Sequence, residues 1–447
     1  MLQRQVQIEF RSKRSVGFQD RPTHSYSNIP VIRLRQLLDN RTAVALLCII
    51  ATGWALIVIW QLRLSPQTTD FSHYYTGALL MREGTNPYTT DLSPIAARMH
   101  MNLNGNTRAT YPPTFELLFA QLTRLPPKQA FWLWTVFNIG LLALIIRWLT
   151  EQLRECNPRI ATAAIALAIL YPPLTIHLKE AQTQILVCFL LVAMIRGLQR
   201  GHSVIAGLAV SAAILLRIYP ATMAGYSLAR RRWLLFGSLC FGVAVGGAIT
   251  CACVGIGRSL SFIQSVPLIK SPLFFRAGDN IAIEAELSKL FWLIWGMPLP
   301  RVPAIFLIGL TISLQVGLVA TTYLITRRTP NSDTDVRIST LWVMTMLVVA
   351  PTVWVQYLVI LFIPFAVILT AWVKGVASRR VTNLASASYV ISAACQVIAS
   401  IAYRFNGNSM NIASFFAQQF TLAALVMCYI ASAWLALERT SGTQISL

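Results

Sequence analysis

Charged side chains are scarce in this sequence, and acidic ones are the scarcest. Charged residues make up 12% of the 447, with 16 Asp and Glu against 37 Lys and Arg, whereas hydrophobic residues reach 55%. Soluble domains usually carry about twice that charged fraction. The composition therefore argues against a large soluble core, and the long uncharged runs that recur along the chain predict an all-α, polytopic membrane protein.

Patterns typical of disulfides and metal sites are also missing. The eight cysteines lie almost entirely within apolar runs, and Cys251 and Cys253 are spaced so that they do not share a helix face. No cluster of several acids with histidine appears among the five histidines. We therefore expect no disulfide, no metal ion and no other cofactor.

About twelve apolar runs have the length and composition of membrane-spanning helices, if shorter runs bounded by charges are accepted. They lie near residues 43–62, 129–149, 160–175, 183–197, 204–217, 219–230, 233–256, 302–326, 338–351, 354–374, 384–402 and 414–437. Two of the intervening segments are long, about 63–128 and about 257–301.

The basic residues are divided unevenly between the two sides of this arrangement. With the N-terminus inside, most Lys and Arg fall on inner segments, as the positive-inside rule expects. This bias explains the net charge of +21 without nucleic acid as a partner. We expect a multi-pass cell-membrane protein with both termini cytoplasmic and both long segments outside. It would have a disordered basic tail at 1–41, one transmembrane domain at 42–437 and a second cytosolic tail at 438–447.

Both outer segments contain helical patterns. In the first, Phe71–Met81 predicts a helix lying at the membrane interface. Phe115–Leu122 is apolar but too short to span a bilayer, so a re-entrant segment is one interpretation. In the second, Ser259–Ile269 is amphipathic and precedes a further apolar stretch at Ile281–Trp295.

Two charged residues stand out against this apolar background. Asp70 follows the first apolar run by a few residues, in an aromatic-rich stretch where lipid-borne substrates would meet water. An acid at that depth is costly to desolvate, although a solvated helix N-cap would account for it equally well. Arg217 lies within an apolar stretch, and a guanidinium there needs an anionic partner, for which a phosphate is suited.

Other polar residues gather at the predicted outer ends of the spans. Lys179 is explained either by phosphate binding or by ordinary snorkelling to the interface. Gln182 and Gln184 stand at a helix start, where they could cap the helix or hydrogen-bond a sugar.

An outward acid and a cation suited to phosphate fit the transfer of a group from a membrane-embedded phospholipid to a hydroxyl. The acid would take the proton of the acceptor, and the cation would neutralise the departing phosphate. A sugar phosphate leaves readily as an anion, so no strong general acid is needed. These residues alone indicate a lipid-facing enzyme or transporter.

An ordered series of short motifs carries a resemblance to a known family. The series runs over roughly 65–370 and consists of Asp70-Phe71-Ser72-His73-Tyr74-Tyr75, Gly84-Thr85-Asn86-Pro87-Tyr88, Tyr111-Pro112-Pro113-Thr114-Phe115-Glu116-Leu117-Leu118-Phe119, Gln182-Thr183-Gln184-Ile185-Leu186, Arg196-Gly197-Leu198-Gln199-Arg200-Gly201, Arg217-Ile218-Tyr219-Pro220, Pro351-Thr352-Val353-Trp354 and Leu361-Phe362-Ile363-Pro364. In these motifs the chain resembles glycosyltransferase family 87, the polyprenyl-phosphate-mannose-dependent mannosyltransferases of the C-type (GT-C) fold.

The resemblance implies roles for individual residues. Asp70 looks like the catalytic base of the family, and Arg217 stands where the family commonly has lysine. Gln184 replaces the usual asparagine, and Asn280 resembles an asparagine of the second outer loop. After Trp354, family members often carry a histidine pair where this chain has Gln356 and Tyr357, and glutamine cannot relay protons.

The sequence therefore predicts an inverting glycosyltransferase that moves a sugar, mannose on family grounds, from a polyprenyl phosphate to a hydroxyl of an envelope lipid or glycan. Asp70 would be the base, Arg217 and Lys179 would hold the phosphate, and the candidates for sugar or acceptor binding are Gln182, Gln184, Gln356, Tyr75, Tyr88 and Asn280. The alternatives are a transporter or flippase of a lipid-linked saccharide, and a non-catalytic relative that binds polyprenyl phosphate.

Overall fold

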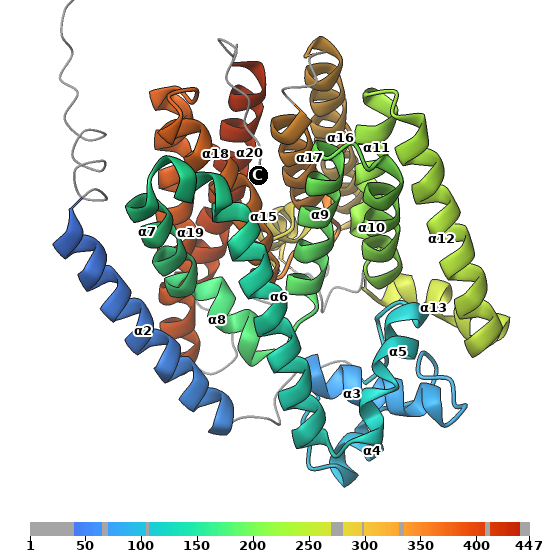
Figure 1. Cartoon of the computed structure of the whole chain (residues 1–447). Helices are drawn as coiled ribbons and strands as arrows, with labels where there is room; N and C mark the ends of the chain where they lie inside the picture. The colour runs from blue at the N-terminus through green and yellow to red at the C-terminus, as the bar shows by residue number, and fades with distance from the viewer. Residues whose placement is uncertain are drawn as a thin grey trace, which may run out of the picture.

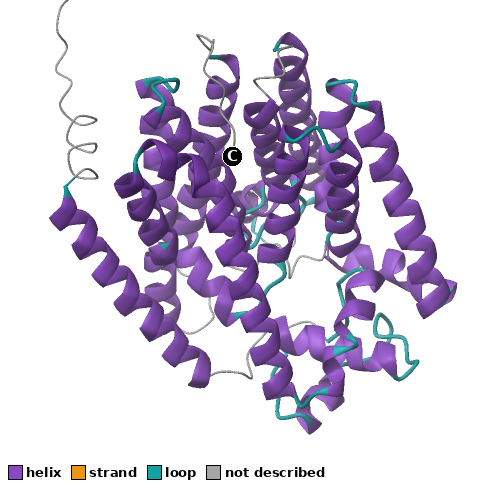
Figure 2. Ribbon diagram, viewed as in Figure 1, coloured by secondary structure: helices purple, strands orange, loops and turns teal. Residues whose placement is uncertain are grey.

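The protein folds as a bundle of helices (Figure 2). The computed structural model describes residues 40–64, 70–103, 107–269, 280–296, 299–329, 335–406 and 412–438. Across these ranges no strand forms, and Asn280 and Trp354 make an antiparallel bridge. Nearly all of the two predicted cytosolic tails lies outside the described residues.

The described helices follow one another as shown in Figure 1. The first half of the chain contains α2 (Arg41–Leu64), α3 (Asp70–Arg82), α4 (Ser93–Arg98), α5 (Pro113–Phe119), the 3₁₀ turn η1 (Leu122–Arg124), α6 (Pro127–Cys156), α7 (Pro158–Leu170), α8 (Pro172–Lys179), α9 (Gln184–Gln199) and α10 (Ser203–Leu216). The second half contains η2 (Tyr219–Thr222), α11 (Met223–Ala229), α12 (Trp233–Val254), α13 (Ile256–Ile269), α15 (Ile283–Trp295), α16 (Arg301–Arg328), α17 (Asp335–Val349), η4 (Val355–Leu361), α18 (Phe362–Val373), α19 (Arg379–Asn406) and α20 (Ile412–Leu437).

The twelve apolar runs all fall on helices, but not all of these helices are long enough to span a bilayer. Among the described residues, seven helices have the length and composition to cross a membrane, and α7 with α8, bent by 50°, would make an eighth. The remaining runs form shorter apolar helices such as α9 and α10. The prediction of an all-helical membrane protein is confirmed, and the count of about twelve spans stays a prediction.

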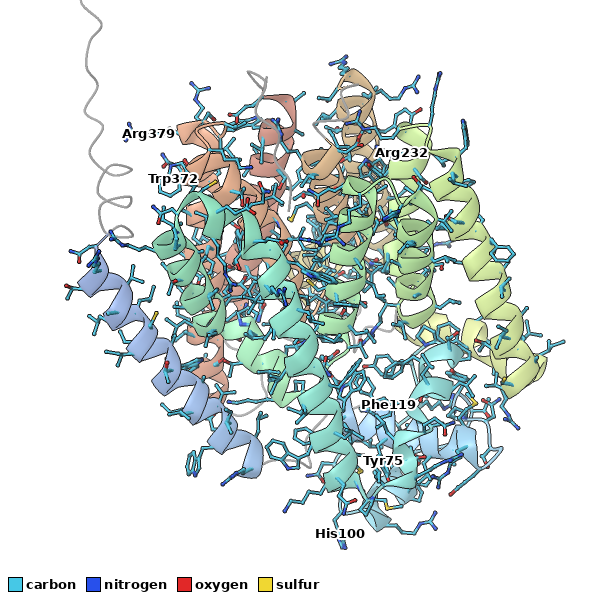
Figure 3. The ribbon with its side chains drawn as sticks, viewed as in Figure 1. Tyr75, His100, Phe119, Arg232, Trp372 and Arg379 are labelled. Carbon is cyan, nitrogen blue, oxygen red and sulfur yellow. The ribbon has the colours of Figure 1, made fainter. Side chains whose placement is uncertain are left out.

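The bundle has two distinct ends. Figure 3 places Arg232, Trp372 and Arg379 at one end, and Tyr75, Phe119 and His100 at the other. The helices α3, α4 and α5 cluster at the second end, which we call the α3 end (Figure 1). The α3 end is therefore built from the first long segment between apolar runs.

The centre of the bundle is formed by α17, η4 and α18. Every residue of α17 from Val336 to Val348 is buried, and η4 is buried along its whole length. A helix that is apolar around its full circumference must be covered by other helices. By contrast, α2 exposes large apolar side chains such as Ile49 and Trp60 and packs on α7, as a lipid-facing helix would.

One predicted surface helix is instead covered by protein. Residues Phe71 to Met81 of α3 are all buried, so this helix does not lie with one face in lipid. Its ring-bearing residues pack edge-to-face against α5 and α6, with ring centroids 5.2 Å apart for Phe71 and Phe131 and 4.9 Å apart for Tyr74 and Phe115. The aromatic residues of this helix are instead part of the buried core of the α3 end.

Candidate active site

Four chain segments meet where the α3 end joins the bundle. They are the first turn of α3, the turn between α8 and α9, the link between α10 and η2, and the start of η4. The polar side chains that these segments bring together are Asp70, Tyr74, Gln182, Thr183, Gln184, Arg217, Tyr219, Gln356 and Tyr357. Segments as distant as residues 70 and 356 therefore share one site.

Asp70 is the first residue of α3 and is partly exposed. The amide Nε2 of Gln182 donates to its Oδ2, and Nε2 of Gln356 approaches the same oxygen at 3.4 Å. Hydrogen bonds from two amides, together with the positive end of the α3 dipole, favour the ionised carboxylate.

Arg217 lies in extended backbone, with φ −152° and ψ 130°, between α10 and η2. Its Nε donates to the hydroxyl of Thr183 at 3.0 Å, and its Nη2 donates to the hydroxyl of Tyr74 and to Oε1 of Gln182, each at 3.2 Å. The guanidinium carbon stands 4.2 Å from the ring centroid of Tyr111. Within the described structure all its hydrogen-bond partners are neutral, so no carboxylate pairs with its positive charge.

Gln182 links the acid to the cation. Its Nε2 donates to Asp70, while its Oε1 accepts from the Tyr74 hydroxyl at 2.8 Å and from Arg217. Burial raises the pKa of the Tyr74 hydroxyl well above 10, so Tyr74 stays protonated and can donate. The amide of Gln182 thus lies between the carboxylate of Asp70 and the guanidinium of Arg217 and hydrogen-bonds to both.

The turn that carries Gln182 is held by an unusual backbone conformation. Ala181 has a φ of 48°, which non-glycine residues seldom adopt, and its carbonyl accepts a hydrogen bond from the indole of Trp134 on α6 at 2.7 Å. Such conformations persist when the surroundings impose them, and they are common at functional sites.

A second group of contacts adjoins Arg217. The Tyr219 hydroxyl donates to Oε1 of Gln184 at 2.6 Å, and the rings of Tyr219 and Tyr357 stack with centroids 5.5 Å apart. Nε2 of Gln184 is buried and has no hydrogen-bond partner among the residues that the structure describes. A buried, unsatisfied amide costs about 1–3 kcal/mol, so a ligand oxygen in its reach would be stabilising.

The structure does not join every predicted site residue to this group. Tyr75 donates to the carbonyl of Leu125 at 2.8 Å, and Tyr88 donates to the carbonyl of Tyr111 at 2.9 Å, so both hydroxyls support loops. Asn280 is fully buried and accepts hydrogen bonds from backbone amides. Lys179 ends α8, next to the turn that carries Gln182.

Several site residues escaped the sequence-based reasoning. Tyr111, Thr183 and Tyr219 all stood in the quoted motifs, and each contacts Arg217 or Gln184. The sequence also contains an Asp-x-Asp pattern at 333–335, of which the structure describes Asp335 alone. Asp335 pairs with Arg230 and Arg232 at the opposite end, and the described residues hold no group of three or more His, Cys, Asp or Glu suited to a metal.

A sequence model of glycosyltransferase family 87 matches residues 109–351, more than half of the chain. The chain belongs to glycosyltransferase family 87. A search of curated proteins finds no match. The matched region contains Gln182 and Arg217, whereas Asp70 and Gln356 lie outside it and reach the site through contacts with each other and with Gln182. Membership of the family identifies the protein as a membrane glycosyltransferase, which uses a sugar donor.

Proposed function

We propose that the protein is an inverting glycosyltransferase of the GT-C fold that uses a polyprenyl-phosphate sugar, mannose being the expected sugar. The acceptor is a hydroxyl of an envelope lipid or glycan. The α3 end lies on the outer face of the cell membrane, both termini are cytoplasmic, and about twelve segments cross the bilayer. The observation that carries this proposal is the amide of Gln182, which holds the carboxylate of Asp70 and the guanidinium of Arg217 on its two sides.

The reaction is a single displacement at the anomeric carbon. Asp70 takes the proton of the acceptor hydroxyl as its oxygen forms the new bond to that carbon. The bond between the anomeric carbon and the phosphate oxygen breaks, and polyprenyl phosphate leaves with the electron pair. Attack and departure on opposite faces invert the anomeric centre.

Arg217 binds the phosphate and stabilises the charge that develops on it. Its recorded hydrogen bonds use Nε and Nη2, which leaves the partly exposed guanidinium able to direct Nη1 to an anion. Because its protein partners are neutral, the phosphate would supply the missing counter-charge. Lys179 would add a second positive charge, and Gln184 and Gln356 would hydrogen-bond the sugar or the phosphate.

A flippase or transporter of a lipid-linked saccharide is the main rival. Transporters commonly place polar groups at the midplane, between paired broken helices of internal repeats. The linked polar residues of this chain gather instead where α3 meets the bundle, and the sequence shows no repeat. A non-catalytic relative that binds polyprenyl phosphate is the second rival, since Gln356 and Tyr357 replace the histidines.

Incubating the purified protein with radiolabelled polyprenyl-phosphate mannose and membrane acceptors tests the proposal. We expect transfer of the label by the wild type and its loss in Asp70→Asn. Asp91→Asn is the matched control because Asp91 is an exposed acid of the same outer segment. Labelled lipid that crosses vesicle membranes unchanged would instead identify a flippase, and binding without transfer would identify a non-catalytic relative.

A further inference from the structure

A buried ion pair lies in α15, outside the site described above. Glu286 and Lys289 are 1% and 2% exposed, and Nζ of Lys289 stands 2.6 Å from Oε1 of Glu286. Removing two charges from water is expensive, and apolar residues of similar volume often stabilise a core equally well. Stability alone is therefore a weak explanation for this pair.

The pair is tied to two other parts of the structure. Nζ of Lys289 also donates to the backbone carbonyl of Asn280 at 2.8 Å. Nε2 of Gln419, on α20, donates to Oε2 of Glu286 at 2.5 Å. The pair thus fastens the segment at residue 280 to a long helix of the bundle.

Asn280 in turn contacts the backbone just before η4. Its Oδ1 accepts the amide N–H of Val353 at 3.1 Å, and the amide of Ile281 donates to the carbonyl of Val353 at 2.7 Å. Asn280 also forms the antiparallel bridge with Trp354. The backbone at Val353 is therefore held by two hydrogen bonds, one from the side chain of Asn280 and one that belongs to the bridge between Asn280 and Trp354.

The residues that follow immediately belong to the site. Trp354 is the N-cap of η4, and Gln356, two residues on, approaches Asp70. Tyr357 stacks on Tyr219 and lies 5.8 Å from the guanidinium carbon of Arg217. Because these contacts depend on where η4 starts, small backbone shifts at 353 and 354 would change them.

We propose that the Glu286–Lys289 pair is a positioning device for the donor site, acting through Asn280 and the start of η4. Neither charged residue contacts Asp70, Arg217 or Gln356 in the described structure. The idea rests on the proposed function, because the phosphate-sugar of the donor is the ligand that Gln356 and Tyr357 would face.

A double-mutant cycle tests the proposal. The variant Glu286→Leu/Lys289→Met replaces both charges by apolar side chains, which keeps an unpaired charge out of the core. We expect it to fold and to bind polyprenyl-phosphate mannose at least 5-fold more weakly than the wild type. In a Gln356→Ala background the same double substitution should weaken binding by a smaller factor than in the wild type, because the contact of Gln356 with Asp70 is already gone and only the contacts of Tyr357 remain to be disturbed.

Tyr429→Phe is the matched control. Tyr429 lies on α20, as Gln419 does, but away from η4. The substitution removes a buried hydrogen bond of 3.0 Å between Tyr429 and Thr322 of α16, so it should lower thermal stability without changing donor affinity. The proposal is overturned if the Glu286→Leu/Lys289→Met variant binds the donor with unchanged affinity, or if the double substitution lowers donor affinity equally in both backgrounds. Failure of this variant to fold would show that the pair has a purely structural role. If donor binding changes as expected in the double-mutant cycle but the wild type transfers no sugar, the positioning role would stand and the proposed transferase activity would be rejected.

Discussion

At the scale of single residues, the decisive feature is that neighbouring opposite charges are joined by a neutral amide. Gln182 donates to Asp70 and accepts from Arg217. A direct ion pair would stabilise both charges in the resting protein and would have to be broken by a substrate. With the amide between them, neither charge neutralises the other directly, which is the arrangement that the proposed roles of base and phosphate ligand require.

Glu116 on α5 yields a prediction about pH. It is fully buried, neither carboxylate oxygen has a hydrogen-bond partner in the described part of the chain, and burial raises its pKa well above the usual 4.5. Between 4.5 and the raised value the folded protein binds more protons than the unfolded one, so stability is present at low pH and is lost as pH rises. The loss is about 1.4 kcal/mol per pH unit in that window.

Glu116→Gln should remove this dependence because the amide does not ionise. The test is the midpoint of thermal unfolding of wild type and variant in detergent between pH 5 and pH 8. We expect the unfolding midpoint of the wild type to fall relative to that of the variant as pH rises. Parallel curves would show that Glu116 is already ionised in the fold.

At the scale of elements, small residues let α10, the helix that precedes Arg217, pack closely against α12. Gly207 of α10 faces Ser238 and the backbone of Leu235 on α12, and Gly242 of α12 faces Ser211 of α10. Such pairs let membrane helices approach closely. The helix then stops at Leu216, and the extended residue 217 places its side chain at the site.

Gly207→Ala should therefore destabilise the protein. Its Cβ would stand 2.6 Å from the carbonyl oxygen of Leu235, closer than backbone can tolerate. We expect a loss of about 1–3 kcal/mol, seen as a lower unfolding midpoint and weaker donor binding. Gly237→Ala is the control, because nothing lies within 4 Å of its Cβ, and it should leave stability unchanged or slightly raised.

The positions of the helices could be predicted from the sequence better than what covers each helix, lipid or protein. Hydropathy located each apolar run, since burial and membrane insertion demand the same residues. It could not separate a helix with one face in lipid from one covered by protein, which is why α3 was predicted at the interface. Asp70 and Arg217 could be singled out as rare charges, but their link through Gln182 depends on tertiary contacts between distant segments.

At the scale of the whole molecule, the two ends of the bundle differ in what they carry. The α3 end holds the site, and the opposite end holds Arg232 and Arg379 (Figure 3). Basic residues favour the cytoplasmic side, so we propose that the α3 end faces outward.

Thiol labelling tests this orientation. In a cysteine-free background, His100→Cys at the exposed α3 end should react with a membrane-impermeant maleimide in intact cells. A variant that retains Cys156 alone, exposed at the far end of α6, should react after the membrane is opened. The reverse pattern would place the site in the cytoplasm.

The most direct test of the central claim compares donor binding and turnover in two variants. Asp70→Asn should bind polyprenyl-phosphate mannose within about 3-fold of the wild type but turn over at least about 100-fold more slowly, because only the base is lost. Arg217→Gln should weaken donor binding about 10-fold or more. An Asp70→Asn variant with wild-type turnover, or an Arg217→Gln variant with wild-type affinity, would contradict the account.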